Sequence, residues 1–477
     1  MRHLAAIAGL RDAYDLVIVG AGPAGMVAAA TASGRGISVL VVDEAPMPGG
    51  QIYRAVAGTR LPRHLLGRDY RHGGKLVQAF SESEADYLPE ASVWHLDETR
   101  TVGISLWGEA RLIAAQQVIL ATGAIERPMP IAGWTLPGVI AAGGAQSLLK
   151  ASGLVPSGRT VLAGMGPLLW LLAAQYIAAG AAPALILDTT PQVNRRHAAR
   201  HLAGFLLSPY ATKGLRLIAR VRRRVRVLST VEELSIGPVE AGLRVTFRRG
   251  RQIEDTRADT VLIHQGVAPN LNLAAAAGCA LEWNEAQACW QPQVDLWGGS
   301  SVAGIAIAGD GAGIVGAEAA AARGELAALE ALRALQAITA AERGRLAVAP
   351  RTRLRRFARG RAFLDALYRP SRAMRLPAPE ALACRCEEVT GRQLADTVRE
   401  LEVVGPNQLK AFLRCGMGPC QGRFCGATVT EAIAAARGVS PAEIGYMRLR
   451  SPVKPITLAE LAAMPSSEAD RHAVVRG

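Results

Sequence analysis

Aromatic residues are scarce in this sequence, at 5% of its 477 positions, and it contains only 7 cysteines and 5 lysines. Apolar residues still make up 50%, and glycines number 50, so the chain can build large, closely packed cores. This composition excludes a disordered chain, a collagen and a small disulfide scaffold. At about 150 residues per domain, the length predicts about three domains. Many small residues and few rings favour nucleotide-binding α/β layers over a lectin-like β-sandwich.

Because lysine is rare, arginine supplies most of the positive charge. The arginines are concentrated in two stretches. Residues 191–230 contain nine Arg and one Lys without any acid, and residues 351–375 contain nine Arg against Asp365 alone. Such a patch can bind nucleic acid or a membrane surface. Neither stretch has the interleaved aromatic residues on which single-stranded nucleic acids stack. We therefore expect a solvated or subunit-docking face and no nucleic-acid partner.

The sequence predicts neither an export signal nor a membrane-spanning helix. Residues 1–10 form only a short apolar stretch before Arg11 and Asp12, which is too short and too poorly flanked for a signal peptide. Residues 161–187 carry no charge, but glycines and prolines near both ends divide them into strand, turn, helix and strand. We expect a cytoplasmic protein, with peripheral association with the inner face of the membrane as a further possibility.

A buried parallel strand is predicted over 15–19, and a glycine-rich turn follows it at once. Its first glycine permits a tight bend, its second lets a pyrophosphate approach the backbone, and its third permits close helix–strand packing. The helix after the turn offers free N–H groups to phosphate. The next strand, over 38–42, ends in two acids, one of which should bind a ribose. The predicted contacts are Gly20, Gly22, Pro23, Ala24, Gly25, Asp43 and Glu44.

Three further segments resemble the flavoproteins that have two dinucleotide-binding domains. Residues 117–128 resemble their crossover segment, and residues 305–311 resemble their second flavin motif, in which an aspartate binds the ribityl chain. Residues 49–51 lie where these proteins wrap the isoalloxazine. The resemblance spans nearly the first 350 residues and implies FAD as the ligand. It adds the contacts Gly49, Gly50, Gln51, Ala121, Thr122, Gly123, Gly309, Asp310 and Gly311.

A second nucleotide unit is predicted between the halves of the first. A strand over 160–163 leads into a turn with Gly164 and Gly166, and the next strand ends in Asp188. This unit resembles the inserted NAD(P)H domain of the same superfamily. Leu169 stands where the third glycine belongs, and a bulky side chain there pushes the helix away from its neighbours. We expect either an adenine nucleotide in another pose or no nucleotide at this site, with NAD(P)H as the alternative.

Five of the seven cysteines lie in the last quarter of the chain, and no closely spaced pair precedes them, which excludes disulfide-reductase chemistry. Cys384 and Cys386 form one pair, and Cys420 and Cys425 form another. Four thiolates suffice for a [2Fe–2S] cluster, with zinc as the alternative. The segment resembles the bacterioferritin-associated-ferredoxin-like [2Fe–2S] domain, in which two residues, not four, separate the second pair. Cys415 matches a small residue of that family and stays outside the predicted shell.

From about residue 14 to 460 the chain resembles the A-type subunit of heteromeric dehydrogenases. That group includes opine oxidases, D-hydroxyproline and proline dehydrogenases, and the cyanide-forming glycine dehydrogenase. The resemblance implies an FAD and [2Fe–2S] subunit that carries electrons from a CH–NH or CH–NH₂ donor to a quinone or dye-linked acceptor. It also implies a D-amino-acid-oxidase-like FAD subunit with the substrate site, a third small subunit in some complexes, and FMN at a subunit interface.

No catalytic residue is identified, since no Arg–Tyr constellation suggests a clamp for an amino-acid carboxylate. A self-sufficient NAD(P)H-dependent reductase is the main alternative function, and a scaffold with vestigial cofactor sites is another.

The predicted fold is α/β, with two Rossmann-like dinucleotide-binding domains, one inserted in the other, and a small helical [2Fe–2S] domain at the C-terminus. In that last domain, helices are expected over 391–402, 406–413 and 427–437. The expected boundaries are 1–150 and 291–345 for the FAD-binding domain, 151–290 for the inserted domain, 346–380 for a basic linker, 381–440 for the [2Fe–2S] domain and 441–477 for a C-terminal tail.

Overall fold

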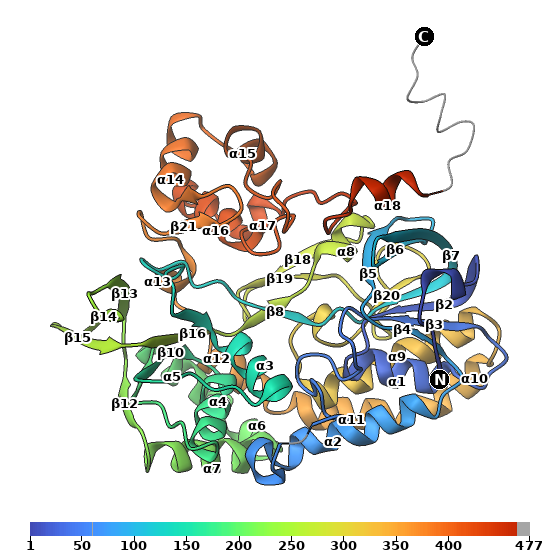
Figure 1. Cartoon of the computed structure of the whole chain (residues 1–477), viewed down its shortest axis with the longest axis horizontal. Helices are drawn as coiled ribbons and strands as arrows, with labels where there is room; N and C mark the ends of the chain where they lie inside the picture. Colours follow the sequence, from blue (N-terminus) through green and yellow to red (C-terminus); the bar gives the residue numbers. More distant parts are fainter. Residues whose placement is uncertain (60, 465–477) are drawn as a thin grey trace.

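Two large sheets organise the molecule, whose residues 1–59 and 61–464 are described by a computed structural model (Figure 1). The larger sheet has the strand order β1 (Arg2–His3), β4 (Asp86–Leu88), β3 (Val39–Val42), β2 (Ala13–Val19), β7 (Glu109–Leu120), β6 (Thr101–Leu106) and β5 (Ser92–Leu96), and β20 (Ile305–Ile307) also pairs with β7. The strands β3, β2, β7 and β20 run parallel. Their Val, Ile and Leu runs are almost wholly buried, because parallel strands are covered on both faces.

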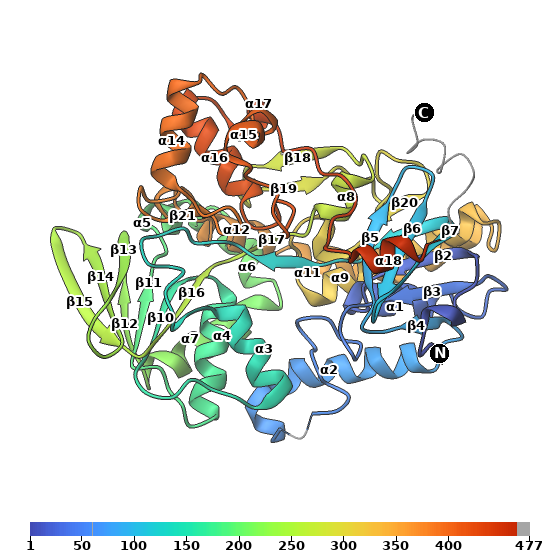
Figure 2. The same cartoon turned by 45° about the horizontal axis from the view of Figure 1, so that its top comes forward.

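Alanine-rich helices cover this sheet. α1 (Pro23–Ala32) and α9 (Ala317–Ala334) lie against each other, and a Cβ on Gly324 would come within 2.1 Å of the Ala24 carbonyl oxygen. The strand, helix and strand predicted near the N-terminus are confirmed as β2, α1 and β3. The unit also contains η1 (Ile7–Gly9), α2 (Arg63–Ser81), η2 (Gly309–Ala312), α10 (Ala340–Leu346) and α11 (Val348–Ala358). In Figure 2, α2 lies at the lower edge of this unit.

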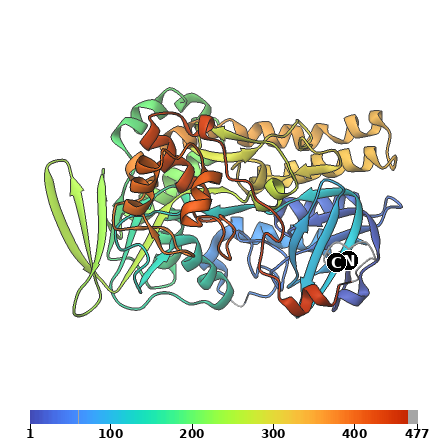
Figure 3. The same ribbon diagram turned by 90° about the horizontal axis from the view of Figure 1, so that it is seen from above.

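The second sheet is parallel, in the order β12 (Arg226–Ser229), β11 (Leu185–Asp188), β10 (Thr160–Met165), β16 (Thr260–Gln265) and β9 (Val139–Ala141). Its helices are α3 (Ala142–Ser152), α4 (Pro167–Ala178), α5 (Gln192–Ala199), α6 (Leu202–Leu206) and α7 (Tyr210–Arg222). The uncharged stretch over 161–187 forms β10, α4 and β11, which confirms the predicted pattern. An antiparallel sheet of β13 (Glu233–Pro238), β14 (Leu243–Arg249) and β15 (Gln252–Ala258) projects from one end of the molecule (Figure 3).

The chain passes between the two units twice. β8 (Ala124–Glu126) leaves the first unit, β17 (Val267–Pro269) returns to it, and the two strands pair antiparallel. β9 already belongs to the second sheet, so we propose that the inserted domain begins near residue 139 and not at 151. A strand of three residues is too short for its pattern to be recognised. After β17, α8 (Asn272–Ala276) and a hairpin of β18 (Leu281–Asn284) and β19 (Cys289–Pro292) lead back to the first sheet.

A small helical unit lies above the other two in Figure 1. Its three expected helices are confirmed as α14 (Gly391–Glu400), α15 (Pro406–Leu413) and α16 (Gly426–Arg437). An ion pair between Arg375 and Glu431, both buried, fixes α16 to the segment before the unit. The remaining elements are α12 (Arg361–Leu367), α13 (Arg372–Arg375), β21 (Leu382–Cys384), β22 (Val389–Thr390), α17 (Pro441–Ile444) and α18 (Leu458–Ala462).

Part of the predicted tail, residues 465–477, lies outside the described residues. Within the described ranges, no helix combines the length and the apolar character that crossing a bilayer requires.

Candidate functional site

The glycine-rich turn between β2 and α1 leaves room for a phosphate. Gly20 has a φ of +106°, and a Cβ there would lie 2.5 Å from the Ala121 carbonyl oxygen, while a Cβ on Gly25 would lie 1.8 Å from the Gly20 oxygen. A Cβ on Gly22, in contrast, would meet only the Gly50 Cα, at 3.9 Å. The first turn of α1 has no side-chain cap and no acid, so its N–H groups are free for an anion. The residues present therefore fit a dinucleotide.

The two acids after β3 face different neighbours. Asp43 accepts hydrogen bonds from the backbone N–H groups of Ala21 and Ala45, which places its carboxylate on the glycine-rich turn. Burial raises the pKa of Asp43, and these two N–H groups oppose the rise. Glu44 forms an ion pair with Lys454. The sequence did not single out this lysine, because it lies more than 400 residues from the turn.

The second flavin motif meets the crossover segment at the carboxyl end of the sheet. Asp310 Oδ1 accepts hydrogen bonds from the N–H groups of Val315 (2.7 Å) and Gly316 (2.9 Å). A Cβ on Gly311 would lie 3.5 Å from Thr122 Oγ1, so the two predicted segments are in direct contact. Thr122 follows β7, which pairs with β2, and Asp310 follows β20, which pairs with β7, so both lie at the carboxyl edge where open α/β sheets bind their ligands.

The segment predicted to wrap the isoalloxazine also joins this site. Gly49 donates its N–H to the carbonyl of Ala21, inside the glycine-rich turn. The buried Lys150 donates to the Gln51 carbonyl at 3.0 Å and to Gln146 Oε1 at 2.7 Å, and its burial lowers its pKa to about 7. Sequence reasoning missed Lys150, since a single lysine within a helix belongs to no motif. The structure thus brings all predicted FAD segments together and adds this lysine.

The second nucleotide turn has a histidine beside it. Gly164 has a φ of +144°, and a Cβ on it would overlap the His264 backbone. A Cβ on Gly166 would lie 3.4 Å from His264 Nε2. The other ring nitrogen, Nδ1, lies 2.6 Å from Glu126 Oε1, and Glu126 Oε2 accepts the N–H of Gly143. His264 is only 2% exposed, so its Nε2 faces the turn from within the protein.

The remaining candidates of that site are engaged in local contacts. Asp188 accepts hydrogen bonds from the N–H and the hydroxyl of Thr190, and it pairs with Arg195 at 3.4 Å. Leu169, which replaces the third glycine, is fully buried in the core. The structure therefore places Gly164, Gly166 and Asp188 at adjoining strand ends, as their positions in β10 and β11 require.

All five cysteines of the last quarter gather in the helical unit. Cys415 and Cys425 lie beside Cys384, and the interaction of their thiols with the Cys384 sulfur lowers the pKa of Cys384 and raises those of its two neighbours. Cys386 contacts Cys420. In the described part of the chain, no three such side chains converge as ligands of one metal ion do. The arrangement is instead two adjoining groups of thiols, and Cys415, which is fully buried, belongs to one of them.

Glycines permit the close approach of the cysteine-bearing loops. A Cβ on Gly418 would lie 2.3 Å from the Cβ of Cys386, and a Cβ on Gly416 would lie 2.6 Å from the Met447 sulfur. Gly416 also has a φ of +90°. A larger residue at Gly418 would separate the loop over 415–425 from Cys386, and one at Gly416 would separate it from Met447. The glycines thus explain how the two predicted pairs come together.

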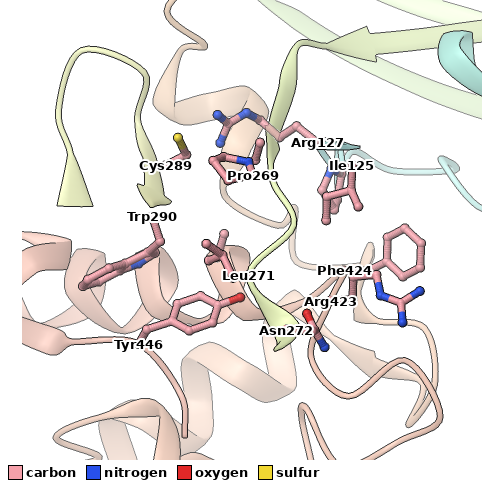
Figure 4. Close-up of a pocket in the computed structure, with 13 residues that line it drawn as sticks. Ile125, Arg127, Pro269, Leu271, Asn272, Cys289, Trp290, Arg423, Phe424 and Tyr446 are labelled. Atoms are coloured by element: carbon pink, nitrogen blue, oxygen red, sulfur yellow. The ribbon is translucent and has the colours of Figure 1, made fainter. Parts of the chain in front are cut away.

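An aromatic contact joins the cysteine unit to the flavin unit. The rings of Trp290, in β19, and Tyr446 lie 5.7 Å apart, and both line a cavity of about 30 Å³ with Arg127, Cys289 and others (Figure 4). A cavity of this size holds about one water and is too small for a cofactor. Tyr446 also reaches α16, because a Cβ on Gly426 would lie 2.3 Å from its hydroxyl.

The hairpin that carries Trp290 also touches the second flavin motif. The side chain of Gln287 donates to the Ile314 carbonyl at 2.9 Å and accepts the Ile314 N–H at 3.1 Å. A Cβ on Gly313 would lie 2.8 Å from Gln291 Oε1. One hairpin therefore contacts the Asp310 segment on one side and the cysteine unit on the other.

Comparison with known proteins adds the family. Residues 14–336 match the pyridine nucleotide-disulphide oxidoreductase family, and residues 387–465 match the sarcosine oxidase A3 domain. The chain is 48% identical to the A-type subunit of opine oxidase from Agrobacterium tumefaciens (strain Ach5), over 98% of this chain and 94% of that protein. It is 50% identical to the corresponding subunit of opine oxidase from Rhizobium meliloti, over 98% and 90%. The chain belongs to the family of opine oxidase A-type subunits.

The fold of this family member is similar to a solved structure. L-proline dehydrogenase from P. horikoshii superposes with a TM-score of 0.70 at 19% identity, over 96% of this chain and 80% of that chain. At this identity the likeness shows the fold alone. The family and the α/β fold class expected from the sequence are confirmed, and the match to the oxidoreductase family supports FAD as a cofactor.

Proposed function

We propose that this chain is the electron-transferring flavin and iron–sulfur subunit of a heteromeric dehydrogenase. The proposed substrates are secondary amines or imino and amino acids, of the opine, D-hydroxyproline or proline class. Relatives named as the A-type subunit of opine oxidase, at 48% and 50% identity, support both the substrate class and the heteromer. The proposed partner is a D-amino-acid-oxidase-like FAD subunit that holds the substrate, with a third small subunit in some complexes.

The observation that carries this proposal is the hairpin over 281–292. It contacts the segment of Asp310 through Gln287, and it contacts the cysteine unit through Trp290 and Tyr446. A bound flavin accepts two electrons as a hydride and releases them singly, which suits a one-electron iron–sulfur centre. Residues of the hairpin and of the cysteine unit also line one cavity together, and its volume of about 30 Å³ is that of a single water. This arrangement supports electron transfer within the chain.

We place FAD at the carboxyl ends of β3, β2, β7 and β20. The open space at Gly22 and the uncapped N-terminus of α1 support the pyrophosphate position. Asp43 supports a ribose contact, since its carboxylate lies on the same turn. Asp310 keeps Oδ2 free of hydrogen bonds from the described residues, which leaves an acceptor for the ribityl hydroxyls. Lys150 orients the Gln51 segment at the isoalloxazine end.

We place a [2Fe–2S] cluster at Cys384, Cys386, Cys420 and Cys425. Each iron of such a cluster takes two thiolates, and Cys384 lies beside Cys425 while Cys386 lies beside Cys420. The proposed flavin site on the same chain favours this electron carrier over zinc. Cys415 then acts as a hydrogen-bond donor to the Cys384 sulfur rather than as a ligand. Such donors are one of the means by which a protein sets the cluster's reduction potential.

Two further cofactors belong to the proposal. The glycine turn of Gly164 and Gly166, which follows the parallel strand β10 and precedes α4, supports an adenine nucleotide in the inserted domain. FMN would lie at the interface with the partner subunit. The acceptor would be a quinone or a dye-linked chain, and the arginine-rich helices α5 and α7 offer a face for another protein of the complex or for the membrane surface.

Reconstitution tests the proposal. Co-expression with the D-amino-acid-oxidase-like partner should give a complex that reduces an artificial dye when an opine or a cyclic imino acid is added. This chain alone should contain flavin and iron and show no substrate oxidation. Substrate oxidation by this chain alone would contradict the proposed division of roles.

A further inference from the structure

After the cysteine unit, the chain crosses back to the flavin unit. We call residues 451–457 the C-terminal strap. Val453 is fully buried among the core residues of the flavin unit, and its N–H donates to the Trp94 carbonyl at 2.8 Å. The helix after the strap, α18, contacts β7. The strap thus belongs structurally to the flavin unit, although in sequence it follows the cysteine unit.

Lys454, the residue after Val453, lies at the ribose end of the dinucleotide site. Its amino group pairs with Glu44, and only 20% of its side chain is exposed. It is close enough to Asp43 for the two charges to stabilise each other, and burial lowers its pKa to about 8.

The neighbours of Lys454 offset only part of the free-energy cost of burying its ammonium group. Withdrawing an ammonium from water is costly unless it is paired and hydrogen-bonded, and an ammonium has three donors to satisfy. Glu44 is itself 54% exposed, and ion pairs with exposed partners contribute little. The amino group therefore retains donors for a ligand at this site. It also offsets the charges of Asp43 and Glu44, which would otherwise repel an anionic pyrophosphate.

We propose that Lys454 is a ligand of the adenosine diphosphate half of FAD, delivered to the site by the C-terminal strap. This inference rests on the proposed FAD site and adds a residue that no dinucleotide motif contains. Because the strap continues from the cysteine unit, FAD binding and docking of the strap stabilise each other, and this coupling is reciprocal. Bound FAD then contacts both the glycine-rich turn near the N-terminus and the C-terminal strap.

Two measurements on the full-length protein test the inference. The first is the affinity of the protein for FAD and the rate at which it releases FAD. Both are monitored by the rise in flavin fluorescence after dilution. Lys454→Met should weaken FAD binding about 10- to 100-fold, the loss expected for a charged hydrogen bond, and Lys454→Arg should restore most of it. Lys75→Met removes an exposed lysine of α2 and should leave FAD binding unchanged.

The second measurement needs no variant. Hydrogen exchange at the Val453 amide of the wild-type chain should slow when FAD is added to the apoprotein, because the ligand stabilises the docked strap. The inference requires both results. Equal FAD release from wild type and Lys454→Met, or equal exchange with and without FAD, would overturn it. A wild-type chain that binds no FAD would instead contradict the proposed function.

Discussion

Replacing Gly22 by alanine should remove FAD while leaving the apoprotein folded. The backbone at Gly22 is extended, with φ −76° and ψ −172°, which alanine also adopts. The new methyl would meet only the Gly50 Cα, at 3.9 Å, so we expect an apoprotein stability within about 1 kcal/mol of wild type. The same methyl would fill the space in which we place the pyrophosphate. Loss of two charged hydrogen bonds, at ~1.5–3 kcal/mol each, weakens FAD binding about a hundred- to ten-thousand-fold.

The assay compares flavin absorbance per protein after desalting with thermal unfolding of the apoprotein. Gly74→Ala, on α2 with no atom within 4 Å of the new Cβ, is the matched control and should keep its flavin. Gly25→Ala should lose both flavin and stability, since its Cβ would lie 1.8 Å from the Gly20 oxygen. A Gly22→Ala protein with its full flavin content would refute the placement of the pyrophosphate.

Other predictions concern the second nucleotide, the cluster and the buried ion pair. NADH and NADPH should reduce the flavin slowly or not at all; reduction at turnover rates in stopped flow would favour the self-sufficient reductase. Cys420→Ser should abolish the cluster's visible absorption and its paramagnetic resonance after reduction, whereas Cys415→Ser should keep both, and the reverse pattern would move Cys415 into the shell. Arg375→Met leaves Glu431 buried without its partner and should destabilise the cysteine unit by about 3–5 kcal/mol in denaturant unfolding; a loss below about 1 kcal/mol would contradict this.

The glycine-rich turn between β2 and α1 was predictable because its conformation is specified locally. Gly20, Gly22 and Gly25 lie in one turn, between a strand and a helix that their own residues specify. Asp310 was assigned through resemblance, and the parallel pairing of β20 with β7 explains how a residue so distant reaches the turn. The helices of the cysteine unit were predictable from their periodicity, which comes from one buried face.

The residues that the sequence did not reveal act across large separations. Lys150 and Lys454 meet the site only after the sheet and the strap have formed, and neither belongs to a motif. The contact of Trp290 with Tyr446 likewise depends on how two units pack. Cys415 looked redundant because four thiolates suffice for a cluster, yet its thiol contacts Cys384. The spacing of the cysteines predicts which of them can be cluster ligands, but it does not identify the residues that donate hydrogen bonds to those ligands.

The central claim is that this chain stores electrons at a flavin and at an iron–sulfur cluster held together by the hairpin over 281–292. An anaerobic reductive titration of the iron-supplied, FAD-loaded chain tests it most directly, with absorbance and paramagnetic resonance followed together. The account predicts uptake of about three electrons per chain, two by the flavin and one by the cluster, with a resonance signal from the reduced cluster. Zinc in place of iron, or uptake of about two electrons without that signal, would contradict it.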